Sequence, residues 1–216
     1  MKRAIACATI FSWAMLSGAA SATTAGEHAI AAFSAAWAKV DTYSCSITAH
    51  EVSGSNVQDR VYDMWFQKSP IMARMNITGG DGKGSAVIWD GSGQVYGHKG
   101  GFLISAIKKH LDLHDPQATS IRGTTVADAS FGAILTHLQA LKGATVDASV
   151  DGADTDVTVT VADPSSDQDV TKEMIVLGPG SLPIEYDQWQ GSAQVKHVLY
   201  TNVQLNGQLP ANIFTL

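Results

Sequence analysis

Cysteine is scarce in this chain: its 216 residues include two, and Cys7 lies within the first 22. Two cysteines cannot build the disulfide framework of a small secreted scaffold. Basic residues are also few, with 14 Lys and Arg against 20 Asp and Glu and a formal net charge of −6. A protein that binds nucleic acid, or binds a membrane surface through charge alone, would normally carry a basic face. We therefore expect no nucleic-acid partner. The hydrophobic share of 45% excludes a disordered chain.

Motifs of catalysis are lacking as well. The chain has no Gly-x-Ser-x-Gly nucleophile elbow and no phosphate-binding loop. His110 and His114 have a spacing that suits a metal on one helix face, with Asp115 beside them. No Glu follows the first His, however, and Pro116 indicates that the helix is ending. We therefore expect no metal and no cofactor, and an undetected hydrolase is the least favoured function.

The first 22 residues read as a secretory signal peptide. Lys2 and Arg3 precede an apolar run over 4–16, and Ala20-Ser21-Ala22 is a small-x-small cleavage site. No later apolar run approaches the roughly 20 residues of a spanning helix. We expect cleavage after Ala22, a periplasmic location, and a single monomeric domain over 23–216 without a transmembrane segment. Cys45 would then be the one remaining cysteine, either a small buried hydrophobe or a reactive thiol.

The pattern of apolar residues predicts a helix, a set of strands, two helices and a second set of strands. The first helix, over 24–40, begins with a capping box formed by Thr24 and Glu27. The two central helices are expected over 102–113 and 128–141, the second capped by Asp128 and ended by Gly143. The expected strands cover 43–52, 57–67, 71–78, 85–89, 94–98, 145–150, 156–161, 171–177, 182–189 and 193–205, with 213–216 as a candidate last strand.

This order predicts an α+β fold. Short turns between successive strands require antiparallel pairing, and a single sheet of about ten strands curls. The expected architecture is therefore an incomplete, half-barrel sheet whose concave face is covered by the N-terminal helix and the two central helices. The apolar surface of that face either fills one core or also lines a cavity.

Several segments resemble the periplasmic lipoprotein carrier family LolA and its relatives with the same half-barrel fold. The resemblance covers nearly the whole of 23–216 in order and spacing, with few identical residues. The segments that carry it are Val57-Gln58, Trp65-Phe66-Gln67-Lys68-Ser69-Pro70, Trp89-Asp90-Gly91, Ala129-Ser130-Phe131, Tyr200-Thr201-Asn202-Val203-Gln204-Leu205-Asn206, Leu209-Pro210 and Phe214. It implies an apolar ligand, such as a lipid or the acyl chain of a lipoprotein, held between the sheet and a helical lid. One departure is Ser69, which stands where the family has an Arg implicated in lid closure.

The residues that would line such a cavity follow from strand alternation and from the resemblance. Ala73, Met75 and Ile77 share one face of their strand, and the family match directs that face inward. The full set of expected ligand-binding residues is Ala73, Met75, Ile77, Val87, Trp89, Phe102, Leu103, Ile107, Phe131 and Leu135. Ser69 is the candidate contact to the lid, and Gly100 and Gly101 are candidate hinge residues.

Two functions are therefore expected before a hydrolase. The first is a carrier or binding protein for an apolar ligand, which acts without covalent chemistry. The alternative is an envelope sensor or scaffold that uses the same fold to bind a protein partner.

Overall fold

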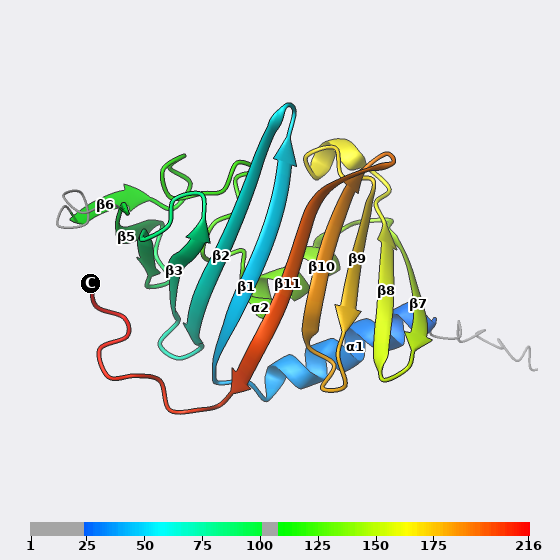
Figure 1. Ribbon diagram of the computed structural model, residues 1–216. Helices are drawn as coiled ribbons and strands as arrows, with labels where there is room; N and C mark the ends of the chain where they lie inside the picture. The colour runs from blue at the N-terminus through cyan, green and yellow to red at the C-terminus, as the bar shows by residue number, and fades with distance from the viewer. Residues whose placement is uncertain (1–23, 101–107) are drawn as a thin grey trace, which may run out of the picture.

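The computed structural model describes residues 24–100 and 108–216. One open antiparallel sheet carries eleven strands in the order β6-β5-β4-β3-β2-β1-β11-β10-β9-β8-β7 (Figure 1). The elements are α1 (Ala25–Ala38), β1 (Thr42–Ser53), β2 (Asn56–Gln67), β3 (Met72–Gly80), β4 (Ala86–Trp89), β5 (Gln94–His98), β6 (Lys108–Asp112), α2 (Phe131–Ala140), β7 (Thr145–Asp151), β8 (Asp154–Thr160), the 3₁₀ turn η1 (Pro164–Ser166), β9 (Lys172–Leu177), β10 (Pro183–Gln190) and β11 (Ala193–Leu205). The α+β class and the half-barrel sheet are confirmed.

The centre of the sheet joins the two ends of the chain. The first strand, β1, pairs on one side with β2 and on the other with β11, the last strand. Strands β2 to β6 extend the sheet in one direction and β10 to β7 extend it in the other (Figure 1). The two halves of the sequence therefore meet at the β1–β11 pair in the middle of an open sheet.

Strand alternation separates a concave face from a convex one. In β1, the alternate residues from Tyr43 to Glu51 are buried and those between them are more exposed. Met75 in β3 and Ala73 beside it belong to the same buried set, as the alternation of 71–78 predicted. Both helices lie over this concave face (Figure 1).

Helix α1 begins as predicted. The Thr24 hydroxyl accepts a hydrogen bond from the backbone N–H of Glu27, and the Glu27 carboxylate accepts one from the N–H of Thr24. The helix packs on β7 and β8. Gly26 makes this approach possible, because a Cβ at that position would run into the Val146 carbonyl of β7.

An aromatic cluster fastens the helices to the sheet. Phe131, the first residue of α2, stacks on Tyr43 with ring centroids 4.6 Å apart and planes inclined by 7°. It meets Tyr200 of β11 edge-on at 5.2 Å. Trp37 of α1 contacts both Tyr43 and Phe66, at 6.2 and 5.5 Å between centroids. Aromatic pairs in such offset or edge-on arrangements stabilise beyond the area that they bury.

The prediction of two central helices is wrong for the part of 102–113 that the structure describes. Residues 102–107 lie outside the described residues, and Lys108–Asp112 form β6, which pairs with β5. Leu111 faces Val95 across the pair, so its burial comes from strand alternation and not from a helical face.

Two boundaries also differ from the prediction. Helix α2 is capped by Ser130, whose hydroxyl accepts from the N–H of Ala133, and not by Asp128. The Asp128 carboxylate instead accepts from the backbone and hydroxyl of Thr125, which closes the preceding turn. The expected strand at 213–216 is a turn and an extended end, and Arg74 of β3 donates to the carbonyls of Ile213 and Thr215.

The expected signal peptide at 1–22 lies outside the described residues. Among residues 24–100 and 108–216, no helix has the length and apolar character needed to cross a membrane.

The aromatic cluster yields a stability prediction. Phe131 is fully buried, so Phe131→Ala should lower the free energy of unfolding by about 3–5 kcal/mol, because it removes a large ring and leaves a cavity. Urea denaturation followed by tryptophan fluorescence measures this change. The matched control is Val150→Ala at a side chain that is 78% exposed, which should change stability by less than about 0.5 kcal/mol. Equal effects of the two variants would contradict the packing described.

Candidate functional site

A cavity of about 440 Å³ lies between the concave face and the segment 113–130 that crosses it. Its floor comes from β1 to β6 and from β10 and β11, and its roof from the residues of 116–129 and from Ile134 of α2. Apolar floor residues include Ile47, Ala49, Met75, Ile77, Val87 and Val198. The volume falls in the range of small-molecule sites, which are concave and mostly apolar with a few polar groups.

The expected ligand-binding residues separate into three groups. Met75, Ile77 and Val87 line the cavity, although Met75 also belongs to the hydrophobic core and Val87 packs against it. Ala73, Trp89, Phe131 and Leu135 belong to the hydrophobic core or pack against it. Phe102, Leu103 and Ile107 lie outside the described residues.

The expected lid and hinge positions are also placed in part. Ser69 is exposed between β2 and β3, and its carbonyl accepts from the Gln67 amide at 3.3 Å. Gly100 lines the cavity and donates its N–H to the Ser85 hydroxyl at 2.9 Å. A Cβ on Gly100 would run into the Lys83 carbonyl, so close packing already requires a glycine there. Gly101 lies outside the described residues, and the hinge stays a prediction.

A row of polar side chains crosses the concave face beside the cavity. Strand register places Gln58 of β2 next to Glu51 of β1, Glu51 next to Lys196 of β11, Lys196 next to Gln188 of β10, and Gln188 next to Glu173 of β9. We call these five residues the polar row. Glu51 is 4% exposed, Lys196 9% and Glu173 0%, so three charged groups of the row are buried.

The polar row holds the roof segment in place. The Glu51 carboxylate accepts from the Thr124 hydroxyl at 3.2 Å and from the backbone N–H of Arg122 at 3.4 Å. The Lys196 ammonium donates to the Thr124 hydroxyl at 2.8 Å and lies 3.6 Å from Glu51. Gln58 accepts from the N–H of Ile121 at 3.2 Å. Buried charges persist when they are paired and hydrogen-bonded, and here the roof supplies the additional partners.

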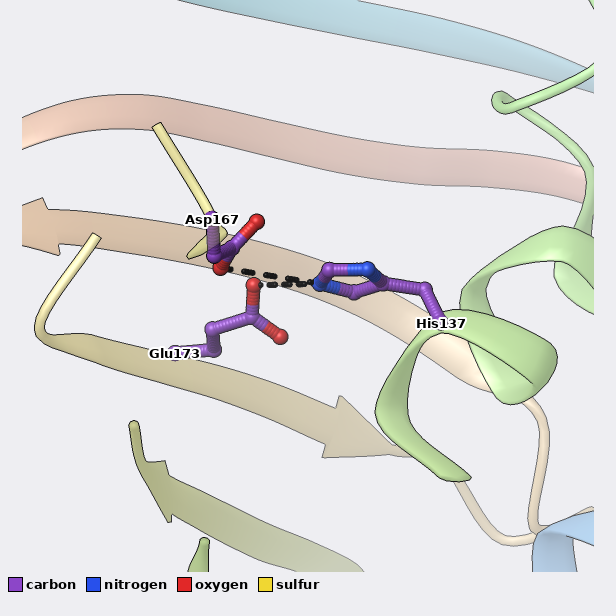
Figure 2. A group of neighbouring side chains, drawn as sticks. All are labelled: His137, Asp167 and Glu173. Atoms are coloured by element: carbon purple, nitrogen blue, oxygen red, sulfur yellow. Dashed lines mark hydrogen bonds and ion pairs between the residues drawn. The ribbon is translucent and has the colours of Figure 1, made fainter. Parts of the chain in front are cut away.

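At its other end the polar row meets a cluster formed by His137 of α2, Glu173 of β9 and Asp167, which follows η1 (Figure 2). The His137 Nε2 atom lies 2.9 Å from Glu173 Oε1 and 3.8 Å from Asp167 Oδ2. Tyr186 and Gln188 also donate to Glu173 Oε1, at 3.0 and 2.8 Å. Glu173 is thus held by three donors on one oxygen.

The three ionisable groups of this cluster change one another's pKa values. The hydrogen bond to Glu173 raises the pKa of the His137 imidazole, although burial opposes it. Burial would raise the pKa of the Glu173 carboxyl, but its contacts with His137, together with the hydrogen bonds from Gln188 and Tyr186, outweigh burial and lower it. Burial, followed by the negative charge of Glu173, raises the pKa of Asp167 to about 6. Two carboxylates therefore compete for the positive charge of one imidazole.

Of the two interpretations of Cys45, a small buried hydrophobe or a reactive thiol, the structure supports the first. The side chain is 5% exposed within the hydrophobic core, and burial, followed by the nearby Asp63 charge, raises the pKa of its thiol to about 12. The thiolate is the reactive form, so Cys45 acts as a small buried hydrophobe.

Reasoning from sequence missed the polar row and the His137 cluster. Glu51 carries a weak signal, because it continues the inward alternation of its strand with a charged residue. Nothing in the spacing of His137, Asp167 and Glu173 indicates that they meet, since they come from a helix, a turn and a strand. The sequence suggests a different pair, His110 and His114. His110 lies in β6 and His114 follows that strand, so the two do not share a helix face.

No protein-family model matches the sequence, and no curated protein matches it. Among solved structures, MucB is similar, with a TM-score of 0.54 and 10% identity over 88% of this chain and 62% of MucB. A structure of the Pseudomonas aeruginosa MucA/MucB complex matches with a TM-score of 0.51 and 12% identity, over 88% of this chain and 61% of that one. An uncharacterized conserved protein from Thermus thermophilus matches at 0.51 and 4% identity, over 86% and 94% of the chains.

The structural neighbours also include the LolA superfamily protein NE2245 from Nitrosomonas europaea, with a TM-score of 0.46 and 12% identity over 88% of this chain and 97% of that one. At 4 to 12% identity, the likenesses to MucB, to the MucA/MucB complex and to the Thermus thermophilus protein show a shared fold.

The polar row yields a second stability prediction. Lys196→Met keeps the apolar stem but leaves Glu51 buried without its cation, so it should lower the free energy of unfolding by about 3–5 kcal/mol. The double variant Glu51→Gln/Lys196→Met should lose clearly less, because it leaves no unpaired charge. Urea denaturation measures both, with Lys142→Met at an exposed position as the control. A double variant less stable than Lys196→Met alone would contradict this account.

Proposed function

We propose that the chain is exported through residues 1–22, acts in the periplasm as a single domain over 23–216, and binds an apolar molecule in the cavity without covalent chemistry. The observation that carries the proposal is the cavity itself, because a sheet and helices that only needed a core would pack without it. Met75, Ile77 and Val87 offer the apolar wall that an acyl chain requires.

The energy of apolar burial is sufficient for such a ligand. Each buried methylene stabilises by about 0.8 kcal/mol, so a chain with ten buried methylenes gains about 8 kcal/mol before the costs of ordering. Met75 adds an adaptable surface, since methionine accommodates flexible chains.

The charges around the cavity define the polar end of the ligand. Its lining includes Arg60, Lys99, Lys109 and Lys196, against Glu51 and Asp128, in a chain whose acidic residues outnumber its basic ones. Glu51 and Lys196 neutralise each other, and Arg60, Lys99 and Lys109 then exceed the single charge of Asp128. A fatty acid or another amphiphile with an anionic end fits this balance better than a cationic one.

Protein binding is a second candidate. The chain shares its fold with MucB, which is found in a complex with MucA. In that case the concave face and its roof would contact a polypeptide of the envelope, and the cavity would not hold a lipid.

Calorimetry with dodecanoate and with dodecylammonium tests the proposal. The full chain is expressed in a bacterium that exports it, delipidated and titrated below the critical micelle concentration of each amphiphile. We expect saturable binding of dodecanoate and at least about tenfold weaker binding of dodecylammonium, a difference of about 1.4 kcal/mol. Native mass spectrometry before delipidation should show an added acyl mass. A clean unliganded mass together with a stable protein complex would favour the second candidate.

Variants of the cavity wall provide the matched comparison. Ile77→Asp places a charge in the apolar wall, and Ala118→Trp fills space under the roof, so each should weaken dodecanoate binding by at least about tenfold. Val57→Asp changes a side chain of β2 that is 55% exposed and should leave the affinity unchanged. Wild-type affinity in a folded Ile77→Asp variant would mean that this face is packed core and not a binding wall.

A further inference from the structure

The cluster of His137, Asp167 and Glu173 has a geometry that its role in packing does not explain. One ligand-capable atom from each residue lies within 4.8 Å of the other two. The closest contact, His137 Nε2 to Glu173 Oε1, is 2.9 Å, and His137 Nε2 to Asp167 Oδ2 is 3.8 Å. Figure 2 shows both carboxylates turned toward the edge of the imidazole ring that carries Nε2. When several ligand atoms each lie about 2.0–2.2 Å from one metal ion, the distances between those atoms are comparable to the two distances found in this cluster.

We propose that His137, Asp167 and Glu173 form a binding site for a divalent transition metal ion such as Zn²⁺. One imidazole and two carboxylates combine the ligands that Zn²⁺ and its first-row neighbours accept in proteins. The proposal concerns a site apart from the cavity and does not rest on the proposed function.

Burial and charge support the site. Glu173 is 0% exposed, and its Oε2 atom has no hydrogen-bond partner. Asp167 Oδ2 is likewise buried without a hydrogen bond. Among the described residues, no Lys or Arg lies within ion-pair distance of either carboxylate. A buried carboxylate oxygen without a partner is costly. A divalent cation would replace the Nε2 proton of His137, which is released to solvent, and would supply the missing contact to Asp167 Oδ2 together with a larger positive charge between the two carboxylates.

The surroundings of the cluster suit a metal ligand set. Tyr186 and Gln188 donate to Glu173 Oε1 and orient its carboxylate, as outer partners do around ligating groups. The His137 side chain is 34% exposed and that of Asp167 12%, so one side of the cluster is open to solvent. An ion could enter from that side and keep water in the remaining positions.

A second cluster, on the convex face, is the natural comparison. Glu185, Asp187 and His197 also bring ligand-capable atoms within 4.8 Å. His197 Nδ1 lies 2.7 Å from Asp187 Oδ1, much as His137 Nε2 lies 2.9 Å from Glu173 Oε1. None of the unpartnered buried polar atoms found in the described residues, however, belongs to Glu185, Asp187 or His197. Buried carboxylate oxygens without a hydrogen bond therefore distinguish the His137 cluster from the convex one.

Titration of the metal-free full chain with Zn²⁺ tests the proposal, with Co²⁺ as a spectroscopic probe. We expect one equivalent of Zn²⁺ to bind and Co²⁺ to give visible ligand-field bands that Zn²⁺ abolishes. His137→Gln and Asp167→Asn should each weaken binding by at least about tenfold. Asp167 lies in a turn at the solvent side, so its variant tests the site with little effect on folding, which circular dichroism verifies.

His197→Gln is the matched control, because it removes an imidazole from the convex cluster. It should leave the Zn²⁺ affinity and the Co²⁺ spectrum unchanged. Absence of stoichiometric binding to the folded wild-type chain would overturn the proposal. Binding that survives both His137→Gln and Asp167→Asn, or that His197→Gln abolishes, would overturn it as well.

Discussion

The buried contact between Glu51 and Lys196 is the constraint on which the rest of the concave face depends. These residues lie on the two strands that join the halves of the sheet, so their pairing also reports the β1–β11 register. Their charges are costly to bury, and the Thr124 hydroxyl between them lowers that cost by bonding to both. The roof segment is therefore positioned by hydrogen bonds at this point and not by apolar contacts alone.

Two separate contacts hold the roof of the cavity against the sheet. At one place Phe131 stacks on Tyr43 and begins α2 against the centre of the sheet. At the other, the polar row bonds to 121–124. Met75 and Val87 line the cavity beneath this roof and also belong to the hydrophobic core or pack against it. The same apolar surface thus provides both a core and a cavity wall.

Local sequence rules predicted the parts of the fold that depend on neighbouring residues. The capping box at Thr24, the strand alternation around Met75 and the turns between strands follow from such rules, and the structure has them. The 108–112 segment was predicted as helix because a few apolar residues fit a helical period, whereas pairing with β5 decides its state. In a short segment of this kind, pairing with a neighbouring strand overrides the local preference for helix.

The candidate sites were harder to predict, because they too depend on contacts between separate elements of the fold. Alternation grouped Met75 and Ile77 on one face of their strand, and the resemblance to the carrier family, which directed that face inward, added Val87 as a further lining residue. The polar row could not be found, since it needs the register of five strands, and the His137 cluster needs a helix, a turn and a strand to converge.

The acidic composition of the chain is unevenly distributed, and this connects the two sites. Cations outnumber acids around the cavity, whereas the His137 cluster holds two carboxylates for one imidazole. Lys196, which is paired with Glu51, and Glu173 are separated in the polar row only by Gln188, so the two sites adjoin each other across one strand. An anionic amphiphile in the cavity and a cation at the His137 cluster would each compensate the excess at its own site. The net charge of −6 describes neither surface, because the arrangement along the polar row, and not the total, decides what each can bind.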